Sequence, residues 1–291
     1  MPELPEVETV RLGLSKLLPG HKIINVDIKN PKTFLGTKAD TSSFLIKAKV
    51  VSVRRRAKIL LIDLDTQYSL VIHLKMTGQL VYVRDDTSRF GAGHPNKSLI
   101  EKLPDKSTRI SLELDGATLF FNDQRKFGWM RLVPTIEVEN LDFYKKLGPE
   151  PLSSDFNVRE FIARIKKRKN TRIKPVLLDQ TVIAGVGNIY ADECLWGAKI
   201  NPSSRVFELE EPQLRLLFKE LQHVLRLAIK KGGSTDKNYV NAEGKAGSYL
   251  IFARVFRREG LACPRCGSII EKTRVAGRGT HYCPTCQKQQ E

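Results

Sequence analysis

The sequence feature that most constrains the fold is a set of four cysteines near the end of the chain. Cys263 and Cys266 form one Cys-x-x-Cys pair, and Cys283 and Cys286 form a second. Two such pairs allow four thiolates to surround one tetrahedral Zn²⁺, and a site filled by four protein ligands has no open position for a catalytic water. We therefore predict a β-hairpin zinc finger over residues 253–291, with one structural Zn²⁺ as the cofactor.

Disulfides or a redox-active thiol pair are the alternative interpretation of these cysteines. Disulfides need an oxidising compartment, and redox Cys-x-x-Cys pairs need a thioredoxin-like context. The sequence shows neither, so the pattern favours zinc and a reducing cytoplasm. We also expect the finger to present the cations that lie between the two pairs, which are Lys272, Arg274, Arg278 and His281.

The balance of charged residues indicates a polyanionic partner. The chain has 49 Lys and Arg against 32 Asp and Glu, a formal net charge of +17, while 41% of its residues are hydrophobic. That hydrophobic content is ordinary for a folded protein, so the charge belongs to a globular surface and not to a disordered tail. No apolar run has the length of a membrane span. We expect a cytoplasmic monomer with no membrane partner.

The hydrophobic period divides the chain into two parts and predicts an α+β fold. A helix is expected from Leu4 to Leu18, followed by short β-branched segments typical of a β-sandwich or barrel. The polar stretch 84–106 is expected to be a long loop. The expected strands are Lys22–Lys29, Lys49–Arg54, Ile59–Leu64, Tyr68–Leu74, Arg109–Leu114, Thr118–Asn122 and Trp129–Val133.

Beyond a linker at residues 147–154 the period becomes helical. The expected domains are therefore 1–146, with an N-terminal helix and β-sandwich, a helical domain at 155–252 and the finger at 253–291. The Gly- and Ser-rich segment 232–248 is expected to be a mobile loop. The expected helices are Phe156–Lys169, Lys174–Gln180, Asn188–Trp196 and Pro212–Lys231.

The amino terminus can carry nucleophilic chemistry. Met1 precedes Pro2, a small residue after which the initiator methionine is normally removed, and this leaves a secondary amine. An α-amino group has a pKa of roughly 7.7–8.0, so part of it is unprotonated and nucleophilic at neutral pH. Glu3 and Glu6 lie beside it, and one of them can serve as a general acid. An ordinary capped helix start is the alternative interpretation.

Two basic segments are candidates for contacts with phosphate groups. Arg54–Lys58 enters a predicted strand, where Arg54, Arg56 and Lys58 would share one face, although a solvated turn is the usual structure of such a run. Residues 163–174 are basic on more than one helical face. The turn 185–188 could hold a phosphate, with a dinucleotide site as the competing interpretation.

Two further segments end predicted strands, HLKMTG and NDQRKFG. Met76, Arg125 and Phe127 in these segments could form an apolar and cationic wedge. An isolated Met or Phe more commonly belongs to a core. Only an enzyme that removes a base from the DNA stack needs such a wedge.

Taken together, these motifs resemble the formamidopyrimidine-DNA glycosylases, bacterial enzymes that excise oxidised purines such as 8-oxoguanine. The resemblance covers nearly the whole chain. It rests on the ordered motifs MPELPEVETV, RRRAK, HLKMTG, DQRKFG, LGPEPL, IKPVLLDQTVIAGVGNIYADE, GGST with GKAGSY, and CPRC with GRGTHYCPTC. The related endonuclease VIII enzymes, which act on oxidised pyrimidines, typically have glycine at the position of Leu4, so the purine branch is favoured.

The resemblance implies an N-terminal β-sandwich, a helical domain with a helix–two-turn–helix motif in which 232–248 caps the lesion, and a zinc finger, with DNA bound between domains. It makes Pro2 the Schiff-base nucleophile that attacks C1′, Glu3 the acid that assists sugar-ring opening, and Glu6 a residue that holds the site. It assigns Lys58 to β-elimination and phosphate contact. It assigns Arg278 to phosphate contact and δ-elimination, and because arginine is a poor proton donor we give Arg278 an electrostatic role.

The resemblance also implies a set of DNA contacts. Met76, Arg125 and Phe127 would fill the gap left by the flipped base, and Arg125 would pair with the orphan cytosine. Two positions depart from the family pattern: Ser107 replaces a DNA-contacting histidine, and Asn170 replaces a common lysine beside Lys169. The remaining expected backbone contacts are His73, Lys174 and Asn188.

The implied function is a bifunctional glycosylase and AP lyase of base excision repair, acting on double-stranded DNA with oxidised purines or abasic sites in the bacterial cytoplasm at the nucleoid. Its alternatives are an endonuclease VIII-type glycosylase for pyrimidines and a non-catalytic sensor of DNA damage on the same fold. A sensor has no need for Pro2, Glu3 and Lys58 together.

Overall fold

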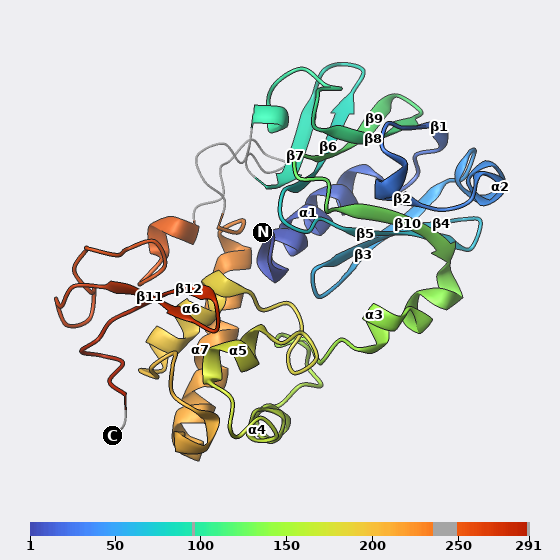
Figure 1. Cartoon of the computed structure of the whole chain (residues 1–291). Helices are drawn as coiled ribbons and strands as arrows, with labels where there is room; N and C mark the ends of the chain where they lie inside the picture. The colour runs from blue at the N-terminus through green and yellow to red at the C-terminus, as the bar shows by residue number, and fades with distance from the viewer. Residues whose placement is uncertain (95–96, 235–248, 290–291) are drawn as a thin grey trace. The chain divides into compact units, whose positions relative to one another are not determined.

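The computed structural model describes residues 1–94, 97–234 and 249–289. Contacts divide the chain into two compact units (Figure 1). Unit 1 comprises Met1–Lys145 and a segment that begins at Lys231, and unit 2 comprises Lys146–Lys230 and the chain from Tyr249 onward. Most of the expected lesion-capping loop, residues 235–248, lies outside the described residues.

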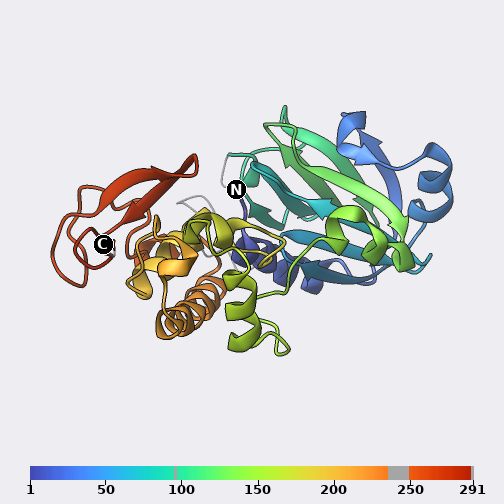
Figure 2. The ribbon, with the colours of Figure 1, turned by 60° about the horizontal axis from the view of Figure 1, so that its bottom comes forward.

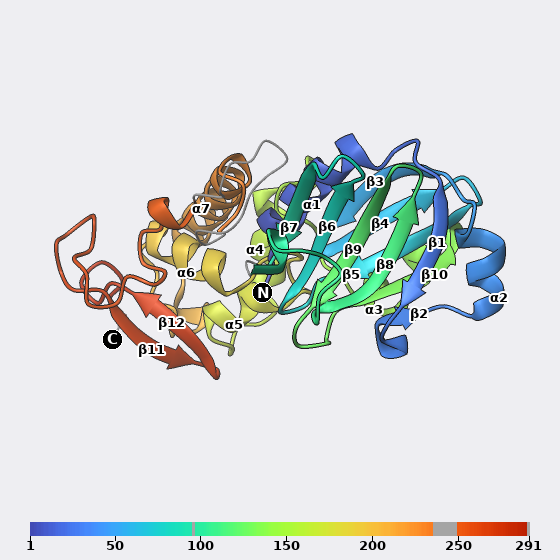
Figure 3. The same cartoon turned by 90° about the horizontal axis from the view of Figure 1, so that it is seen from above.

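Unit 1 is a sandwich of two five-stranded sheets, and Figure 3 shows one sheet lying over the other. Their pairs are antiparallel except for the parallel pair β2–β10. In spatial order the first sheet is β1 (Ile23–Ile28), β8 (Thr108–Leu114), β9 (Ala117–Asp123), β6 (Gly78–Arg84) and β7 (Arg89–Gly93). The second sheet is β2 (Phe34–Leu35), β10 (Trp129–Pro134), β5 (Tyr68–His73), β4 (Ile59–Leu64) and β3 (Val50–Arg56).

Helix α1 (Leu4–Leu17) packs against β3 and β7, the edge strands of the two sheets. Its apolar residues at helical spacing, including Val7, Val10 and Leu14, are fully buried, as the sequence pattern predicts. Gly13 is required at the contact with β7, because a Cβ there would lie 2.1 Å from Cζ of Phe90. The helix therefore covers the side of the sandwich where both sheets end.

The stretch expected to be a long loop, residues 84–106, contains strand β7 and a short helix, η3 (Lys97–Leu99). That expectation was wrong because RFGAG lacks the β-branched residues that mark strands. The segment is a strand because it pairs with β6 and because Phe90 packs closely against α1. Strand β6 was not expected from the sequence either. The other short elements of unit 1 are η1 (Pro31–Thr33), α2 (Lys38–Asp40), η2 (Thr41–Leu45), η4 (Thr135–Asn140) and α3 (Asp142–Lys145).

Unit 2 contains the predicted helices and the finger hairpin, and Figure 2 shows the long helix α7 in orange beside the yellow helices. Helix α6 contacts α5, α7 and β12, and its Asp192, Glu193 and Cys194 are completely buried. The elements are α4 (Val158–Lys166), α5 (Ile173–Leu178), α6 (Asn188–Gly197), η5 (Val206–Glu208), α7 (Glu211–Lys230), η6 (Tyr249–Phe252), β11 (Glu271–Val275) and β12 (Arg278–Tyr282). The predicted α+β class, with sandwich, helices and finger hairpin, is confirmed.

Across the part of the chain that the structure describes, no helix combines the length and apolar character needed to span a lipid bilayer.

Candidate active site and metal centre

The start of α1 holds Pro2 and Glu3 in a buried position. Glu3 is the N-cap residue, and its backbone N–H donates to Oε2 of Glu6 over 2.8 Å in a capping box. Oε1 of Glu6 accepts from the backbone N–H of Ser234 over 2.7 Å. The capped helix start therefore exists, and Glu6 uses its two oxygens to hold the backbone beside Pro2 and the backbone of residue 234.

Lys58 lies in the tight turn between β3 and β4, where Ala57 has a positive φ of 53°. The expectation that Arg54, Arg56 and Lys58 share one strand face is wrong, because the chain reverses at Ala57. Arg54 binds Asp63 over 2.5 Å, whereas the Lys58 side chain is buried. The run therefore comprises the last residues of β3 and a tight turn, and Lys58 does not continue the strand face of Arg54 and Arg56.

Arg55, which the sequence did not single out, connects the Lys58 turn to α1. Its Nε lies 2.7 Å from Glu8 Oε2, and its Nη1 donates to the Ala57 carbonyl over 2.9 Å. Burial raises the pKa of Glu8, but the hydrogen bonds from Arg11 and Arg55 outweigh this and leave the pKa below its ordinary value. Glu8 thus acts as an ionised anchor for both arginines.

His73 ends β5 and pairs across the sheet with Ile59 and Trp129, which begin β4 and β10. The backbone N–H of Lys75 donates to Nδ1 of His73 over 3.0 Å, so this tautomer carries its proton on Nε2. Desolvation and the charges of Lys75 and Lys58 lower the pKa of His73 to about 3. His73 therefore offers a neutral N–H donor at the end of a central strand, beside the start of β4 that follows Lys58.

The three expected wedge residues are on the surface of unit 1. Met76 is 36% exposed and Phe127 is 54% exposed, so the core interpretation of these side chains is wrong. The Arg125 guanidinium lies 4.9 Å from the centre of the Phe127 ring. These residues occupy the β5–β6 and β9–β10 turns, which adjoin because Gly78 pairs with Asp123.

Lys174, expected to contact the DNA backbone, is completely buried. Its Nζ lies 2.6 Å from Asp192 Oδ1 and donates to Thr280 Oγ1 and the Gly279 carbonyl. Asn188 Nδ2 donates to the same carbonyl over 3.0 Å. The expectation that the Lys174 ammonium binds phosphate is wrong, because it is consumed by acceptors inside unit 2. Both residues instead hold the hairpin beside Arg278.

The other expected DNA contacts divide between surface and interior. Lys169 and Asn170 are exposed in the turn that follows α4, and Arg278 is exposed on β12. Ser107 is buried, and its hydroxyl donates to Asp105 Oδ1 over 2.7 Å, so its expected role as a side-chain DNA contact is wrong.

One of the backbone donors expected to hold a phosphate in the tight turn before α6 is used inside the chain. The backbone N–H of Gly185 donates to Oε1 of Gln180 over 2.9 Å. The turn joins α5 directly to α6, so the strand–helix–strand unit of a dinucleotide site is absent around it.

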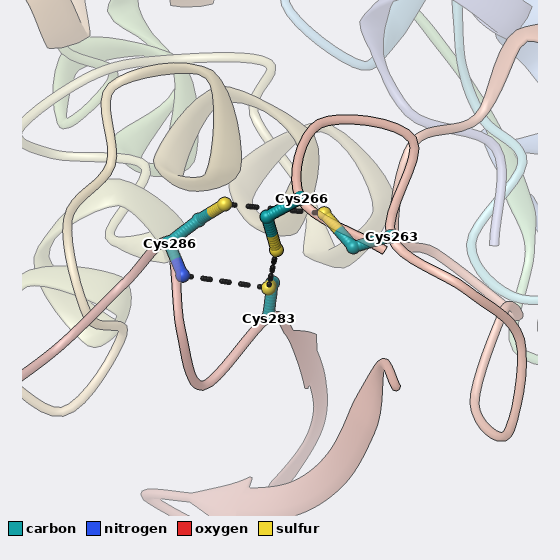
Figure 4. Close-up of side chains that lie close together, drawn as sticks. All are labelled: Cys263, Cys266, Cys283 and Cys286. Carbon is teal, nitrogen blue, oxygen red and sulfur yellow. Dashed lines mark hydrogen bonds between the residues drawn. The ribbon is translucent and has the colours of Figure 1, made fainter. Parts of the chain in front are cut away.

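The four finger cysteines form a metal site, shown in Figure 4. Their sulfur atoms lie within 4.8 Å of one another, and all five cysteines of the chain are free of disulfides. Cys263 and Cys286 are 4.0 Å apart and Cys266 and Cys283 are 3.5 Å apart at sulfur. Tetrahedral zinc with bonds of about 2.3 Å places its sulfurs roughly 3.8 Å apart. The prediction of one structural zinc is confirmed, and disulfides are excluded.

Residues from α6 support the metal site. Trp196 Nε1 donates to Cys263 Sγ over 3.4 Å, and the Arg265 guanidinium lies 3.9 Å from the centre of the Trp196 ring. Hydrogen bonds from Ser268 lower the pKa of Cys266 to about 6, which favours the thiolate that binds zinc.

Of the cations expected on the finger, Lys272, Arg274 and Arg278 are exposed, whereas His281 is buried. Its backbone N–H donates to Asp192 Oδ2 over 3.0 Å, because β12 turns this residue toward α6.

Three family models match successive parts of the chain. The N-terminal domain of formamidopyrimidine-DNA glycosylase matches residues 1–130, its H2TH domain matches 147–239, and the zinc finger found in FPG and IleRS matches 260–289. The formamidopyrimidine-DNA glycosylase of Pelotomaculum thermopropionicum is 42% identical over 290 residues, 99% of each chain. That of Streptococcus mutans is 40% identical over 291 residues, 99% of this chain and 100% of its own.

Solved structures agree with these matches. A complex of Lactococcus lactis Fpg with DNA containing an abasic site has a TM-score of 0.87 and 35% identity, covering 99% of this chain and 100% of that one. A complex of the same Fpg with DNA containing an oxidised pyrimidine has a TM-score of 0.86, with the same identity and coverage. The fold and domains define a DNA glycosylase of base excision repair. The chain belongs to the formamidopyrimidine-DNA glycosylase family.

Proposed function

We propose that this protein excises oxidised purines, 8-oxoguanine and formamidopyrimidines, from double-stranded DNA and then cleaves the strand at the resulting site. The observation that carries the proposal is the start of α1, where Glu6 binds the backbone of Glu3 and fixes the buried residues Pro2 and Glu3. The names of the relatives, formamidopyrimidine-DNA glycosylases, support the choice of lesion.

In the proposed reaction the secondary amine of Pro2, freed by removal of Met1, attacks C1′ of the damaged nucleotide. A bond forms between nitrogen and C1′ while the bond from C1′ to the base breaks, and the base leaves with a proton. Glu3 supplies a proton that assists opening of the sugar ring. The cationic iminium then withdraws electrons, so loss of the C2′ proton expels the 3′ phosphate, and a second elimination expels the 5′ phosphate.

The lysine and arginine of the site act on the phosphates in this proposal. Lys58, in the turn anchored by Arg55, contacts phosphate and assists the first elimination. Arg278 stabilises the phosphate released in the second elimination by its charge, because a guanidinium stays protonated at neutral pH. Lys174 and Asn188 position Arg278 through the Gly279 carbonyl.

The remaining contacts bind and deform the duplex. His73 donates its neutral N–H to the DNA backbone, and the exposed Lys169 and Asn170 lie on a further phosphate-contacting surface. Met76, Arg125 and Phe127 fill the gap left by the extruded nucleotide. Their exposure supports this role because a wedge must be accessible to the duplex.

A side-by-side excision assay tests the proposal. Duplexes that carry 8-oxoguanine or thymine glycol are incubated with enzyme in excess, and released base and cleaved strand are measured together. We expect faster release of 8-oxoguanine, with strand cleavage that follows base release. Base release without strand cleavage would contradict the lyase step.

Oxidised pyrimidines are the second candidate substrate. The specific observation in their favour is the Lactococcus lactis Fpg complex with DNA containing an oxidised pyrimidine. Faster release of thymine glycol than of 8-oxoguanine in the same assay would assign this chain to pyrimidine repair. DNA binding without any base release would instead indicate a damage sensor.

A further inference from the structure

The two turns that carry the wedge residues share one buried carboxylate, that of Asp123. Met76 lies on the β5–β6 turn, and Arg125 and Phe127 lie on the β9–β10 turn. The three side chains can act together only if an interaction fixes the two turns relative to each other. Asp123 ends β9 and is completely buried. Its backbone pairs with Gly78, the first residue after the Met76 turn.

Each oxygen of this carboxylate accepts hydrogen bonds from the wedge turns. Oδ1 accepts from the Thr77 hydroxyl and from the backbone N–H of Arg125 over 3.2 Å. Oδ2 accepts from the backbone N–H of Gly128 over 2.6 Å. The Arg125 N–H also donates to Thr77 Oγ1 over 3.1 Å, which closes a ring through both turns. The neighbours of Met76 and of Phe127 are therefore tied to one group.

The surrounding structure keeps this carboxylate in place. Asp123 donates its own N–H to the Ser107 carbonyl over 2.8 Å, and Arg109 Nε donates to the Asp123 carbonyl over 2.7 Å. Gly128 has no side chain at the closest approach, where a Cβ would lie 3.1 Å from Oδ2 and 2.8 Å from Cζ of Phe121. The backbone carbonyl of Ser107 and the side chain of Arg109 therefore fix the backbone of Asp123.

We propose that Asp123 is a positioning residue that sets the wedge, so that the preference for the base opposite the lesion depends on a side chain inside the sandwich. This rests on the proposed function, in which Arg125 meets the orphan base. Hydrogen bonds to a charged acceptor are stronger than neutral ones, and burial shields them from water. A wedge displaced by a fraction of an ångström would still unstack DNA but would meet the orphan base poorly.

The test uses the full-length protein and the substitution Asp123→Asn. Asparagine keeps the size of the side chain but replaces one acceptor oxygen by an NH₂ group, which must face either the Gly128 N–H or the Thr77 and Arg125 donors. Thr77→Val is the second variant, since it removes only the hydroxyl. Asp63→Asn is the control, because Asp63 is a partly buried carboxylate of the other sheet that accepts from Arg54, Ser52 and Ser69 and does not contact the wedge turns.

The readout is the ratio of single-turnover excision rates for 8-oxoguanine opposite cytosine and opposite adenine, with thermal unfolding measured alongside. We expect Asp123→Asn to lower this ratio by roughly tenfold and Thr77→Val to lower it less, while Asp63→Asn lowers the melting temperature without changing the ratio. Covalent trapping on an abasic site reports the chemistry at Pro2 and should persist in all three variants.

The outcomes separate the two proposals. Wild-type protein that neither excises nor is trapped would refute the proposed function. Wild-type protein that discriminates, together with an unchanged ratio in Thr77→Val and in folded Asp123→Asn, would overturn the role of Asp123. Should Asp123→Asn fail to fold, Thr77→Val decides alone.

Discussion

Lys174 Nζ lies 2.6 Å from Asp192 Oδ1, and both side chains are fully buried. A lysine in a basic segment usually faces water, which is why the sequence indicated a phosphate contact. The partners of Lys174, which are Asp192 and Gly279, are remote in sequence, and no local sequence pattern predicts these contacts. Removing one partner of such a pair leaves an uncompensated buried charge and destabilises the fold, so loss of function in a Lys174 variant would not by itself show a DNA contact.

His73 carries a prediction about pH at the same scale. Its pKa is about 3 in the folded protein against 6.5 for the ordinary group. Between these values the unfolded chain binds a proton that the folded chain does not, so the folded state is disfavoured as pH falls through this window and the effect is absent above pH 6.5. His73→Gln should abolish this dependence, which amounts to at most about 1.4 kcal/mol per pH unit.

The measurement is thermal unfolding of wild type and His73→Gln at about pH 7.5 and about pH 4.5, on either side of the ordinary histidine pKa. The stability of wild type relative to the variant should decrease toward the lower pH. A difference between the two proteins that does not change with pH would show that His73 titrates alike in folded and unfolded chains.

At the scale of elements, α6 organises unit 2. Glu193 accepts backbone N–H groups from Arg254, Val255 and Phe256, which fixes the chain entering the finger. Trp196 reaches the metal site from the same helix. The burial of Glu193 follows from these backbone donors some sixty positions away, which periodicity cannot reveal.

Helix α6 should therefore stabilise bound zinc, and the fluorescence of its Trp196 should change when zinc is removed. Trp196→Phe removes the N–H donor to Cys263 Sγ while keeping an aromatic ring for Arg265, and we expect zinc to be lost to a chelator roughly 10-fold faster. Metal analysis of the untreated protein should find about one zinc per chain. The rate of zinc loss is followed with a colorimetric indicator.

Trp129→Phe is the matched control, since Trp129 is the other tryptophan of the chain and lies in unit 1. It should leave the rate of zinc loss unchanged. Removal of zinc should also change Trp196 fluorescence in the Trp129→Phe protein. Equal rates in the two variants would show that the Trp196 hydrogen bond does not support the site.

At the scale of the whole molecule, the net charge of +17 is unchanged by internal ion pairs, because each pair uses one cation and one anion, but the pairs show which cations of the basic runs already have a carboxylate partner. Arg54, Arg55, Arg164, Arg168 and Lys174 all form internal ion pairs. Exposed cations outside these pairs include Lys169, Arg274 and Arg278, of which Lys169 and Arg278 are expected DNA contacts.

The sequence was sufficient for the class of fold, the zinc site and most helix and strand positions, because each depends on local spacing. Strand β7 was missed since its strand character comes from β6 and α1. The sequence identified Lys58, His281 and Ser107 as candidate site residues but not the direction of their side chains. The reversal of the chain at Ala57 directs Lys58, the contact with α6 directs His281, and the hydrogen bond to Asp105 directs Ser107. Asp123 and Arg55 lie within the motifs DQRKFG and RRRAK, but local spacing does not show that Asp123 binds both wedge turns or that Arg55 binds Glu8.

The central claim, that the amine of Pro2 forms a Schiff base with damaged DNA, is tested by borohydride trapping on an 8-oxoguanine duplex. We expect a covalent complex in which peptide mapping places the adduct on Pro2, and a large loss of trapping in Pro2→Gly but not in Pro5→Gly, which alters a proline of the same segment. Full trapping by protein whose amino terminus is blocked would contradict the claim.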